Sequence, residues 1–205
     1  MKPIIVIGEG GHSKVIQDII SASGVYTIIA ILDDKYTELF EKDGIKIGPI
    51  SEFSKLESSE AIIAIGSNHI RKKIVERLEC VTYATLIHPS AIISPSANIA
   101  EGTVVMAGSI INADTIIGKH AIINSLAVIE HDNNIRDYAH ISPGAILTGN
   151  VQVGEGTHIG AGVTIIPGKN VGNWSIIGAG ATVVQDIPND VTAVGIPAKV
   201  LKHLN

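Results

Sequence analysis

The chain of 205 residues is 45% hydrophobic but only 3% aromatic, which predicts one or two domains with aliphatic cores. A net charge of −5 without a Lys/Arg cluster argues against nucleic-acid binding, and no apolar run approaches the ~18 residues that would span a membrane. The single cysteine, Cys80, excludes an intramolecular disulfide and a cysteine-based metal cluster.

The N-terminal residues "MKPIIVIGEGG" reach a glycine turn too early for a signal peptide, so we expect a cytoplasmic protein. Residues 1–82 then alternate apolar runs with amphipathic segments. Strands are predicted over 3–8, 26–34 and 61–66, and helices over 12–23 and 67–79. The helical stripes include Val15 and Ile70, and Ser67 or Asn68 is the expected N-cap of the second helix. This pattern predicts a Rossmann-like α/β domain with a mostly parallel sheet.

A glycine turn, "GEGGH" (8–12), joins the first strand to the first helix. Its backbone N–H groups could meet a phosphate at the positive end of the helix. The dinucleotide fingerprint is incomplete, because Ser13 occupies the third glycine position. Asp33 and Asp34, at the end of the second strand, are placed to bond ribose hydroxyls. The turn therefore suits a mononucleotide, although a purely structural turn and a solvated acidic loop remain alternatives.

From Ile87 to Val183 the hydrophobic period becomes six, with 17 aliphatic positions in uninterrupted register. Small residues follow most of them four positions later: Ala91, Ala97, Thr103, Ser109, Thr115, Ala121 and Ala127. A six-residue period fits neither a helix nor an ordinary strand, but it fits a β-solenoid whose hexapeptides form the flat sides of a prism. With three sides to each coil, residues 18 apart stack. Residues 83–205 are therefore predicted to form an all-β domain.

The stretch "IEHDN" (129–133) places His131 beside Asp132 near a corner of this prism. A carboxylate bonded to one ring nitrogen makes the imidazole a stronger base and leaves the other nitrogen free to accept a proton. His131 is therefore a candidate general base that Asp132 orients, with a solvated surface histidine as the alternative. Glu130 is expected to be a surface residue that could substitute for Asp132.

A second candidate feature is a groove beside His140, which should stack on His158 in the next coil. Small residues spaced by 18 accompany them: Ser142, Gly160 and Gly178; Pro143, Ala161 and Ala179; Gly144, Gly162 and Gly180. Adjacent coils lie about 4.8 Å apart, so these columns would form a smooth groove suited to a pantetheine arm. The alternative is that the glycines serve the packing of the solenoid.

The hexapeptide repeats, the closing "VGIPAK" (194–199), the N-terminal "GEGGHSKV" and the "IEHD" motif resemble the PglD/NeuD-like sugar acetyltransferases of the hexapeptide-repeat acyltransferase superfamily, over nearly the whole chain. The resemblance implies a left-handed parallel β-helix, a homotrimer with active sites between subunits, and acetyl-CoA as co-substrate. It implies that the N-terminal domain binds the uridine diphosphate of a nucleotide sugar. The residues that match the family's motifs are Gly10, Gly11 and His12 on the diphosphate side, Asp33 and Asp34 on the nucleoside side, Gly66 as a further substrate contact, His131 and Asp132 as the catalytic pair, and His140, Ala161 and Ala179 at acetyl-CoA.

Together these features predict an acetyl-CoA-dependent N-acetyltransferase that acts on a UDP-linked 4-amino-4,6-dideoxy sugar, without a metal. Acetyl-CoA would lie along His140, Gly160, Ala161, Gly178 and Ala179. The alternatives are an O-acetyltransferase of the sialic-acid type, a zinc hydratase or hydrolase with histidines from two subunits, and a non-catalytic nucleotide-sugar sensor.

Overall fold

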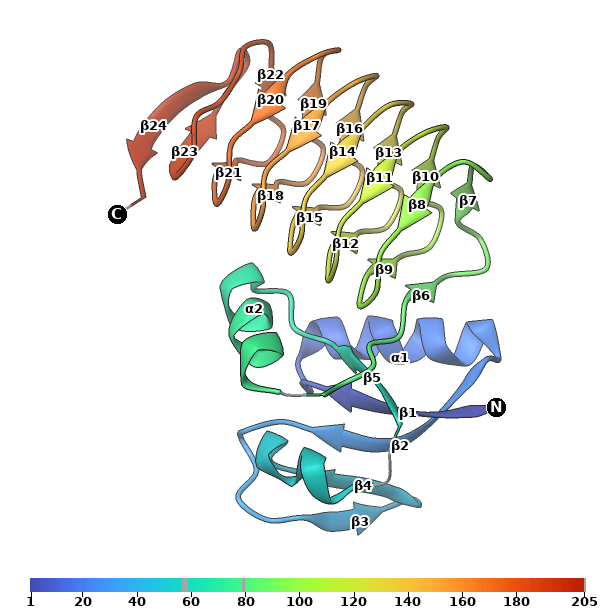
Figure 1. Cartoon of the computed structure of the whole chain (residues 1–205). Coiled ribbons are helices and arrows are strands. Elements are labelled where there is room, and N and C mark those ends of the chain that lie inside the picture. Colours follow the sequence, from blue (N-terminus) through green and yellow to red (C-terminus); the bar gives the residue numbers. More distant parts are fainter. Residues whose placement is uncertain (57–58, 79, 205) are drawn as a thin grey trace. The chain divides into compact units, whose positions relative to one another are not determined.

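The chain folds into two compact units, Met1–Pro89 and Ser90–Asn205 (Figure 1). The computed structural model describes residues 1–56, 59–78 and 80–204. The sequence placed the domain boundary slightly earlier, between residues 82 and 83. The first unit is an α/β domain and the second is a β-solenoid.

The first unit is built on a five-stranded sheet in the order β3-β4-β2-β1-β5. Strands β1, β2, β4 and β5 are parallel and β3 joins β4 antiparallel, which confirms the predicted mostly parallel sheet. The elements are β1 (Lys2–Ile7), α1 (Gly11–Ser23), β2 (Tyr26–Leu32), β3 (Phe40–Lys42), β4 (Ile45–Gly48), the 3-10 helix η1 (Ile50–Lys55), β5 (Glu60–Ile63), α2 (Asn68–Arg77) and β6 (Leu86–Ile87).

One face of this sheet packs against η1 and α2 in a continuous aliphatic core that includes Ile50 and Ile74. The predicted helical stripes are wrong at two positions, because Val15 is 40% and Ile70 is 50% exposed. Ser67 caps α2 as predicted, with its side chain accepting a hydrogen bond from the Ile70 N–H.

Arg71 is buried on α2, although the predicted apolar stripe of this helix did not include it. Its guanidinium donates to the backbone carbonyls of Ile65 at 3.0 Å and Gly66 at 3.3 Å, and to Oδ1 of Asn68 at 2.8 Å. A buried charge is tolerated when hydrogen bonds satisfy it in this way. Arg71 therefore ties the loop that follows β5 to the first turns of α2.

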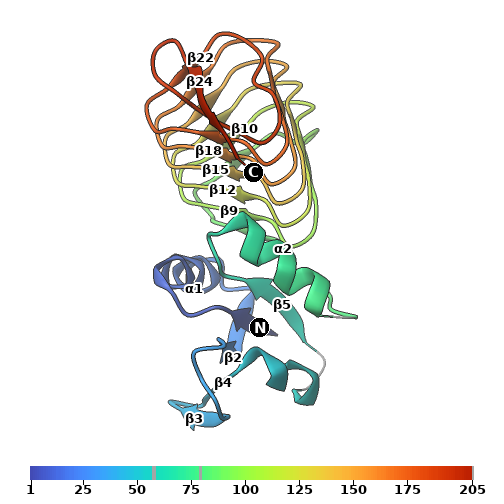
Figure 2. The same cartoon turned by 90° about the vertical axis from the view of Figure 1, so that its left-hand side faces the viewer.

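The second unit stacks triangular coils, whose two-residue strands pair with the strands 18 residues before and after them (Figures 1 and 2). Face 1 consists of β7 (Ile92–Ile93), β10 (Ile110–Ile111), β13 (Val128–Ile129), β16 (Ile146–Leu147), β19 (Thr164–Ile165) and β22 (Thr182–Val183). Face 2 consists of β8 (Asn98–Ile99), β11 (Ile116–Ile117), β14 (Asn134–Ile135), β17 (Gln152–Val153) and β20 (Asn170–Val171). Face 3 contains β9 (Val104–Val105), β12 (Ile122–Ile123), β15 (His140–Ile141), β18 (His158–Ile159), β21 (Ile176–Ile177), β23 (Val191–Val194) and the antiparallel β24 (Lys199–His203).

The inward positions of the six-residue repeat form the core of the solenoid, as predicted. From Val105 to Val183 each of these aliphatic side chains is at most 2% exposed. The prediction is wrong for Ile87, which is 38% exposed while its neighbour Leu86 is buried. Its strand β6 is the terminal strand of the face 3 sheet, so Ile87 has a coil of the stack on one side only. The small residues also point inward, and the hydroxyl of Thr115 donates to the Glu130 carbonyl at 2.9 Å.

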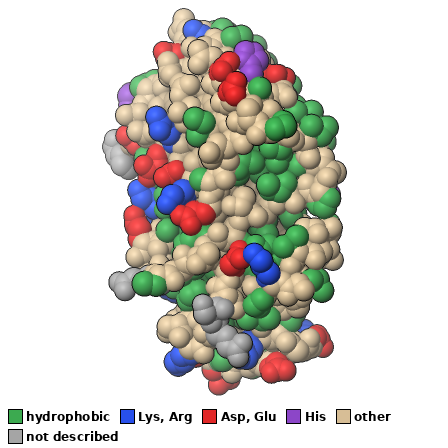
Figure 3. All heavy atoms as spheres, turned by 45° about the vertical axis from the view of Figure 1, so that its right-hand side comes forward, with side chains coloured by type: hydrophobic (Ala, Val, Ile, Leu, Met, Phe, Trp, Pro, Cys, Tyr) green, Lys and Arg blue, Asp and Glu red, His purple; other side chains and the backbone are tan. Residues whose placement is uncertain are grey.

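The outward side chains differ between the faces of the solenoid. Face 1 presents an apolar ridge of Ile92, Ile110, Val128 and Ile146, with Ile92 64% and Ile146 40% exposed. The outward residues of face 2 are mostly amides: Asn98, Asn134, Gln152 and Asn170. Hydrophobic side chains also gather on the surface that Figure 3 shows. Contiguous exposed apolar surface is typical of an interaction site. Among the described residues, no helix is long and apolar enough to cross a membrane.

Candidate active site

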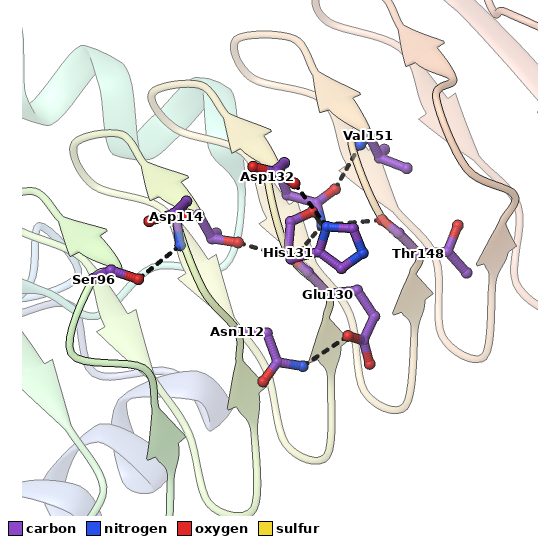
Figure 4. A network of polar contacts seen from close by, with 10 residues as sticks. Ser96, Asn112, Asp114, Glu130, His131, Asp132, Thr148 and Val151 are labelled. Carbon is purple, nitrogen blue, oxygen red and sulfur yellow. Dashed lines mark hydrogen bonds and ion pairs between the residues drawn. The ribbon is translucent and has the colours of Figure 1, made fainter.

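The turn after β13 brings His131 and Asp132 together at the corner between face 1 and face 2 (Figure 4). Asp132 has a φ of 60°, a left-handed conformation that aspartate tolerates better than most residues. Its Oδ2 lies 2.7 Å from Nδ1 of His131, so the short aspartate side chain reaches the ring. Both side chains are accessible, with 62% of His131 and 58% of Asp132 exposed.

The hydrogen bond to Asp132 raises the pKa of His131 above its ordinary value. Because the carboxylate accepts from Nδ1–H, the neutral ring carries its proton there and keeps Nε2 as the proton acceptor. The pair therefore has the chemistry of an exposed general base.

Two residues that sequence reasoning missed hold this turn in place. Asn133 is buried, donates to the Thr148 carbonyl at 3.0 Å and accepts from the Val151 N–H at 2.9 Å, which ties the turn to the next coil (Figure 4). Gly149 lies against the imidazole, since a Cβ there would stand 2.8 Å from Nε2 of His131. The 18-residue spacing between His131 and Gly149 was a sequence signal for this contact.

Glu130 is engaged with the preceding coil rather than with the imidazole. Its Oε2 accepts a hydrogen bond from Nδ2 of Asn112 at 2.9 Å, and Figure 4 shows its side chain extending toward that residue. The predicted surface role of Glu130 fits this arrangement.

His140 stacks on His158, as the 18-residue spacing predicted, with ring centroids 4.7 Å apart and an interplanar angle of 2°. Asn124 lies 3.1 Å from Nε2 of His140 through its Nδ2, while its Oδ1 accepts from the Ser125 N–H at 2.8 Å. Since the amide oxygen is already used, the NH₂ group faces the ring, so Nε2 of His140 is an acceptor and Nδ1 carries the proton. Ser142 bonds Nε2 of His158 at 2.8 Å.

The columns of small residues lie where the sequence placed them, beside the turns that join face 3 to face 1. Ala161 and Ala179 are exposed, and their columns form a smooth strip. Gly160 has a structural role as well, because an added Cβ would lie 2.6 Å from the Ile177 carbonyl oxygen and 2.7 Å from the Ala179 nitrogen. At Gly178 an added Cβ would meet Cγ1 of Val194 at 2.7 Å.

This difference predicts distinct effects for two neighbouring substitutions. Gly160→Val should destabilise the protein by about 1–3 kcal/mol, because its side chain is forced into the backbone of the next coil. Ala161→Leu should leave the thermal midpoint unchanged and raise KM for acetyl-CoA, the co-substrate that the sequence resemblance implies, because its side chain fills the exposed strip. Thermal unfolding and steady-state kinetics on both variants measure this. An unchanged KM in a folded Ala161→Leu protein would contradict the groove.

His131 and the small-residue strip lie at opposite edges of face 1. The turn 130–133 joins face 1 to face 2, whereas the turns 142–145 and 160–163 join face 3 to face 1. The apolar ridge of face 1 therefore separates the two features within one chain.

The glycine turn of the first unit is open above α1. Gly8 has a φ of 105°, and an added Cβ would lie 2.6 Å from Cγ1 of Ile65. At Gly10, Gly11 and Gly66, by contrast, an added Cβ would meet no atom within 4 Å. Close approach of a ligand to this backbone is therefore possible, next to the N-terminus of a 13-residue helix.

The two acids after β2 have different surroundings. Asp33 supports the glycine turn, because its Oδ2 accepts from the Glu9 N–H at 2.7 Å. Asp34 faces away from the turn and forms a two-pronged ion pair with Arg77, with Nη1 to Oδ2 at 2.8 Å and Nη2 to Oδ1 at 3.3 Å. Arg77 lowers the pKa of Asp34. The sequence placed both acids at ribose hydroxyls, and the structure brings only Asp33 to the glycine turn.

His12 follows the glycine turn as a neutral side chain. Burial, followed by the nearby charge of Arg71, lowers the pKa of His12 to about 4. Its Nε2 is buried and has no hydrogen-bond partner among the described residues. A buried ring nitrogen in this state is suited to bonding a ligand that approaches the turn.

A zinc centre would require several convergent ligands. Among residues 1–56, 59–78 and 80–204, no group of three His, Cys, Asp or Glu side chains could hold a metal ion.

Comparisons with known proteins match both units. The family model of the PglD N-terminal domain matches residues 3–78, and that of the bacterial transferase hexapeptide repeats matches residues 134–167. UDP-N-acetylbacillosamine N-acetyltransferase from Bacillus subtilis is 47% identical over 99 residues, which are 45% of this chain and 46% of that protein. The match thus spans about half the length of this curated relative.

Solved structures are similar over the whole chain. A variant of perosamine N-acetyltransferase from Caulobacter crescentus, in complex with CoA and GDP-perosamine, is 38% identical with a TM-score of 0.92 and covers 98% of both chains. The acetyltransferase domain of PglB from Neisseria gonorrhoeae, in complex with acetyl coenzyme A, is 37% identical with a TM-score of 0.90 and covers 98% of this chain and 99% of that one. This full-length similarity shows that the protein belongs to the PglD-like acyltransferases of the hexapeptide-repeat superfamily. Their fold is an N-terminal α/β domain followed in the chain by a left-handed parallel β-helix.

Proposed function

We propose that the protein transfers an acetyl group from acetyl-CoA to the amine of a nucleotide-linked 4-amino-4,6-dideoxy sugar. The observation that carries this proposal is the His131–Asp132 pair, exposed at a solenoid corner with 2.7 Å between Nδ1 and Oδ2. The full-length relatives that bind CoA together with a nucleotide sugar, or acetyl-CoA, support it.

His131 acts as the general base in a direct transfer. As the sugar amine attacks the thioester carbonyl, a C–N bond forms and Nε2 of His131 takes the amine proton. The C–S bond then breaks, and the imidazolium returns that proton to the leaving sulfur, which releases the CoA thiol and the neutral base. Asp132 keeps the imidazole oriented and stabilises its charged form. His140, whose ring Asn124 holds through Nε2, lies on the acetyl-CoA side of the site, beside the strip. Ala161 and Ala179 provide the strip along which the pantetheine arm lies, together with Gly160 and Gly178.

The α/β unit anchors the nucleotide. Gly10, Gly11 and His12 receive the diphosphate, because the backbone there is open and the helix terminus carries positive potential. Asp33 lies beside them and keeps acceptor capacity for a ribose hydroxyl, and Gly66 leaves space for the sugar side.

The active site lies between subunits of a homotrimer. Within one chain, His131 and the small-residue strip occupy opposite edges of face 1. When the apolar ridge of face 1 packs against a neighbouring chain, the His131 corner of one subunit can meet the strip of the next. The ridge itself supplies the apolar surface that such an interface buries.

The test is a thiol-release assay with acetyl-CoA and a panel of nucleotide-linked 4-amino-4,6-dideoxyhexoses. We expect CoA release in step with a product that is heavier by one acetyl group. Nucleotide-sugar binding without thiol release would favour a sensor instead. Transfer only to sugars that lack the amine would establish an O-acetyltransferase.

A further inference from the structure

A pocket of about 570 Å³ opens in the α/β unit, away from the glycine turn. Ile50, Phe53 and Leu78 form its apolar walls, and Ser51 and Ser54 add hydroxyls. Asp34 and Arg77 complete the lining as the ion pair described above. Ile50 is almost fully buried, so this wall is a fixed part of the fold.

The pocket lies along the same edge of the sheet as the glycine turn and Asp33. Strands β1, β2 and β4 are neighbours in the sheet and parallel, so their carboxyl ends lie along one edge. The glycine turn follows β1, Asp33 and Asp34 follow β2, and Ile50 comes shortly after β4. Ligands of such sheets lie across the carboxyl ends of the strands. A nucleotide whose diphosphate lies at β1 and whose ribose lies at Asp33 therefore places its base beside β4, in the pocket.

The polar lining presents acceptors and donors side by side. The Asp34 carboxylate is held by the Ile50 N–H at 3.0 Å and lies against the Arg77 guanidinium. Because Arg77 lowers the pKa of Asp34, the carboxyl is charged at neutral pH and acts as an acceptor only. The pair is roughly half exposed, at 53% for Asp34 and 47% for Arg77, so its groups can be shared with a ligand.

Guanine matches this arrangement around its edge. It presents two adjacent donors, N1–H and the N2 amine, which suit a carboxylate, followed by the O6 and N7 acceptors, which suit the guanidinium N–H groups that the ion pair leaves unused. Uracil presents a single N3–H between two carbonyl oxygens, so a carboxylate there is repelled by one of them. Adenine likewise places a donor between two acceptors.

We propose that this pocket binds the nucleobase and that the Asp34–Arg77 pair selects guanine, which makes the substrate a guanosine diphosphate sugar. This inference rests on the proposed function and differs from the uridine nucleotide that the sequence suggested. Ile50, Phe53 and Leu78 contact the faces and edges of the base, and the two charged side chains read its polar edge.

The first test is calorimetric titration of the unmodified protein with GDP, UDP and dTDP, without acetyl-CoA. We expect GDP to bind at least tenfold more tightly than the pyrimidine nucleotides. Equal or tighter binding of UDP would overturn the guanine assignment and leave the proposed acetyl transfer intact. If none of the three nucleotides binds, both the pocket assignment and the nucleotide part of the proposed function are wrong.

The second test changes the hydrogen-bonding character of Asp34 and of the nucleobase together. Asp34→Asn replaces an acceptor by a donor, so GDP binding should weaken at least tenfold while xanthosine diphosphate, which carries O2 in place of the N2 amine, should bind more tightly. Glu52→Gln is the matched control, since it removes a carboxylate paired with Lys55 on the same 3-10 helix but outside the pocket lining. If Asp34 has only a structural role, the substitution should weaken the binding of GDP and of xanthosine diphosphate equally, and that result would overturn the proposal.

Discussion

His131→Ala is expected to lower kcat at least about a hundredfold, within the range typical of losing a general base. The affinity for the nucleotide sugar should change little, because His131 lies on the solenoid and the glycine turn proposed to bind the nucleotide lies in the other unit. Glu130→Gln is the matched control, since the Glu130 carboxylate bonds Asn112 and not the ring. Steady-state kinetics with saturating acetyl-CoA measure the effect, and unchanged turnover in His131→Ala would exclude the mechanism.

The same pair is expected to govern the pH dependence of the proposed transfer. A base must be neutral, so kcat/KM should fall as the pH drops through the pKa of His131. Because Asp132 raises that pKa, the fall should begin at a higher pH than for an unpaired histidine. Asp132→Asn removes the charge, so the acidic limb should move to lower pH while the plateau rate decreases. An acidic limb at the same pH in this variant would show that another group titrates.

Ile110→Lys is expected to dissociate the proposed trimer and with it remove nearly all activity. The lysine would place an unpaired charge in the middle of the apolar ridge of face 1, where an interface depends on apolar contact. Ile116→Lys on face 2 is the matched control, because Ile116 also points outward and is 52% exposed there. Light scattering after size-exclusion chromatography gives the mass of each variant. A monomeric, fully active unmodified protein would refute the shared active site.

Mixing two inactive variants tests whether the active site is shared between two subunits, without dissociating the assembly. A His131→Ala chain retains a complete strip, and an Ala161→Trp chain retains its base. Co-refolded mixtures should recover activity, because mixed trimers contain sites that combine the intact half of each chain. Absence of recovery in confirmed mixed trimers would place both halves within a single chain.

The core of the solenoid was predictable from the sequence, because an aliphatic residue recurs at every sixth position and marks the side chain that points inward. The failure at Ile87 arose because its strand β6 ends the face 3 sheet, so its side chain lacks the covering that a coil on each side gives the later positions. The contact between the His131 and Asp132 side chains was also predictable, because the two residues are neighbours in the sequence and share one turn.

Contacts between elements distant in the sequence were not predictable in the same way. Arg77 meets Asp34 across 43 residues, and that pairing depends on how α2 crosses the strand ends. Likewise Arg71 is buried because the carbonyls of the preceding loop face it, whereas its charge alone suggested an exposed position. Tertiary packing overrides residue-type preferences at such positions.

The stacked coils give the solenoid a constant rise per coil along its axis. Each added coil would lengthen the molecule by about 4.8 Å without turning any side chain, provided that the insertion is a whole coil. A shorter insertion would rotate every later residue onto another side of the prism. The length of the small-residue strip can therefore change only in discrete increments, one complete coil at a time.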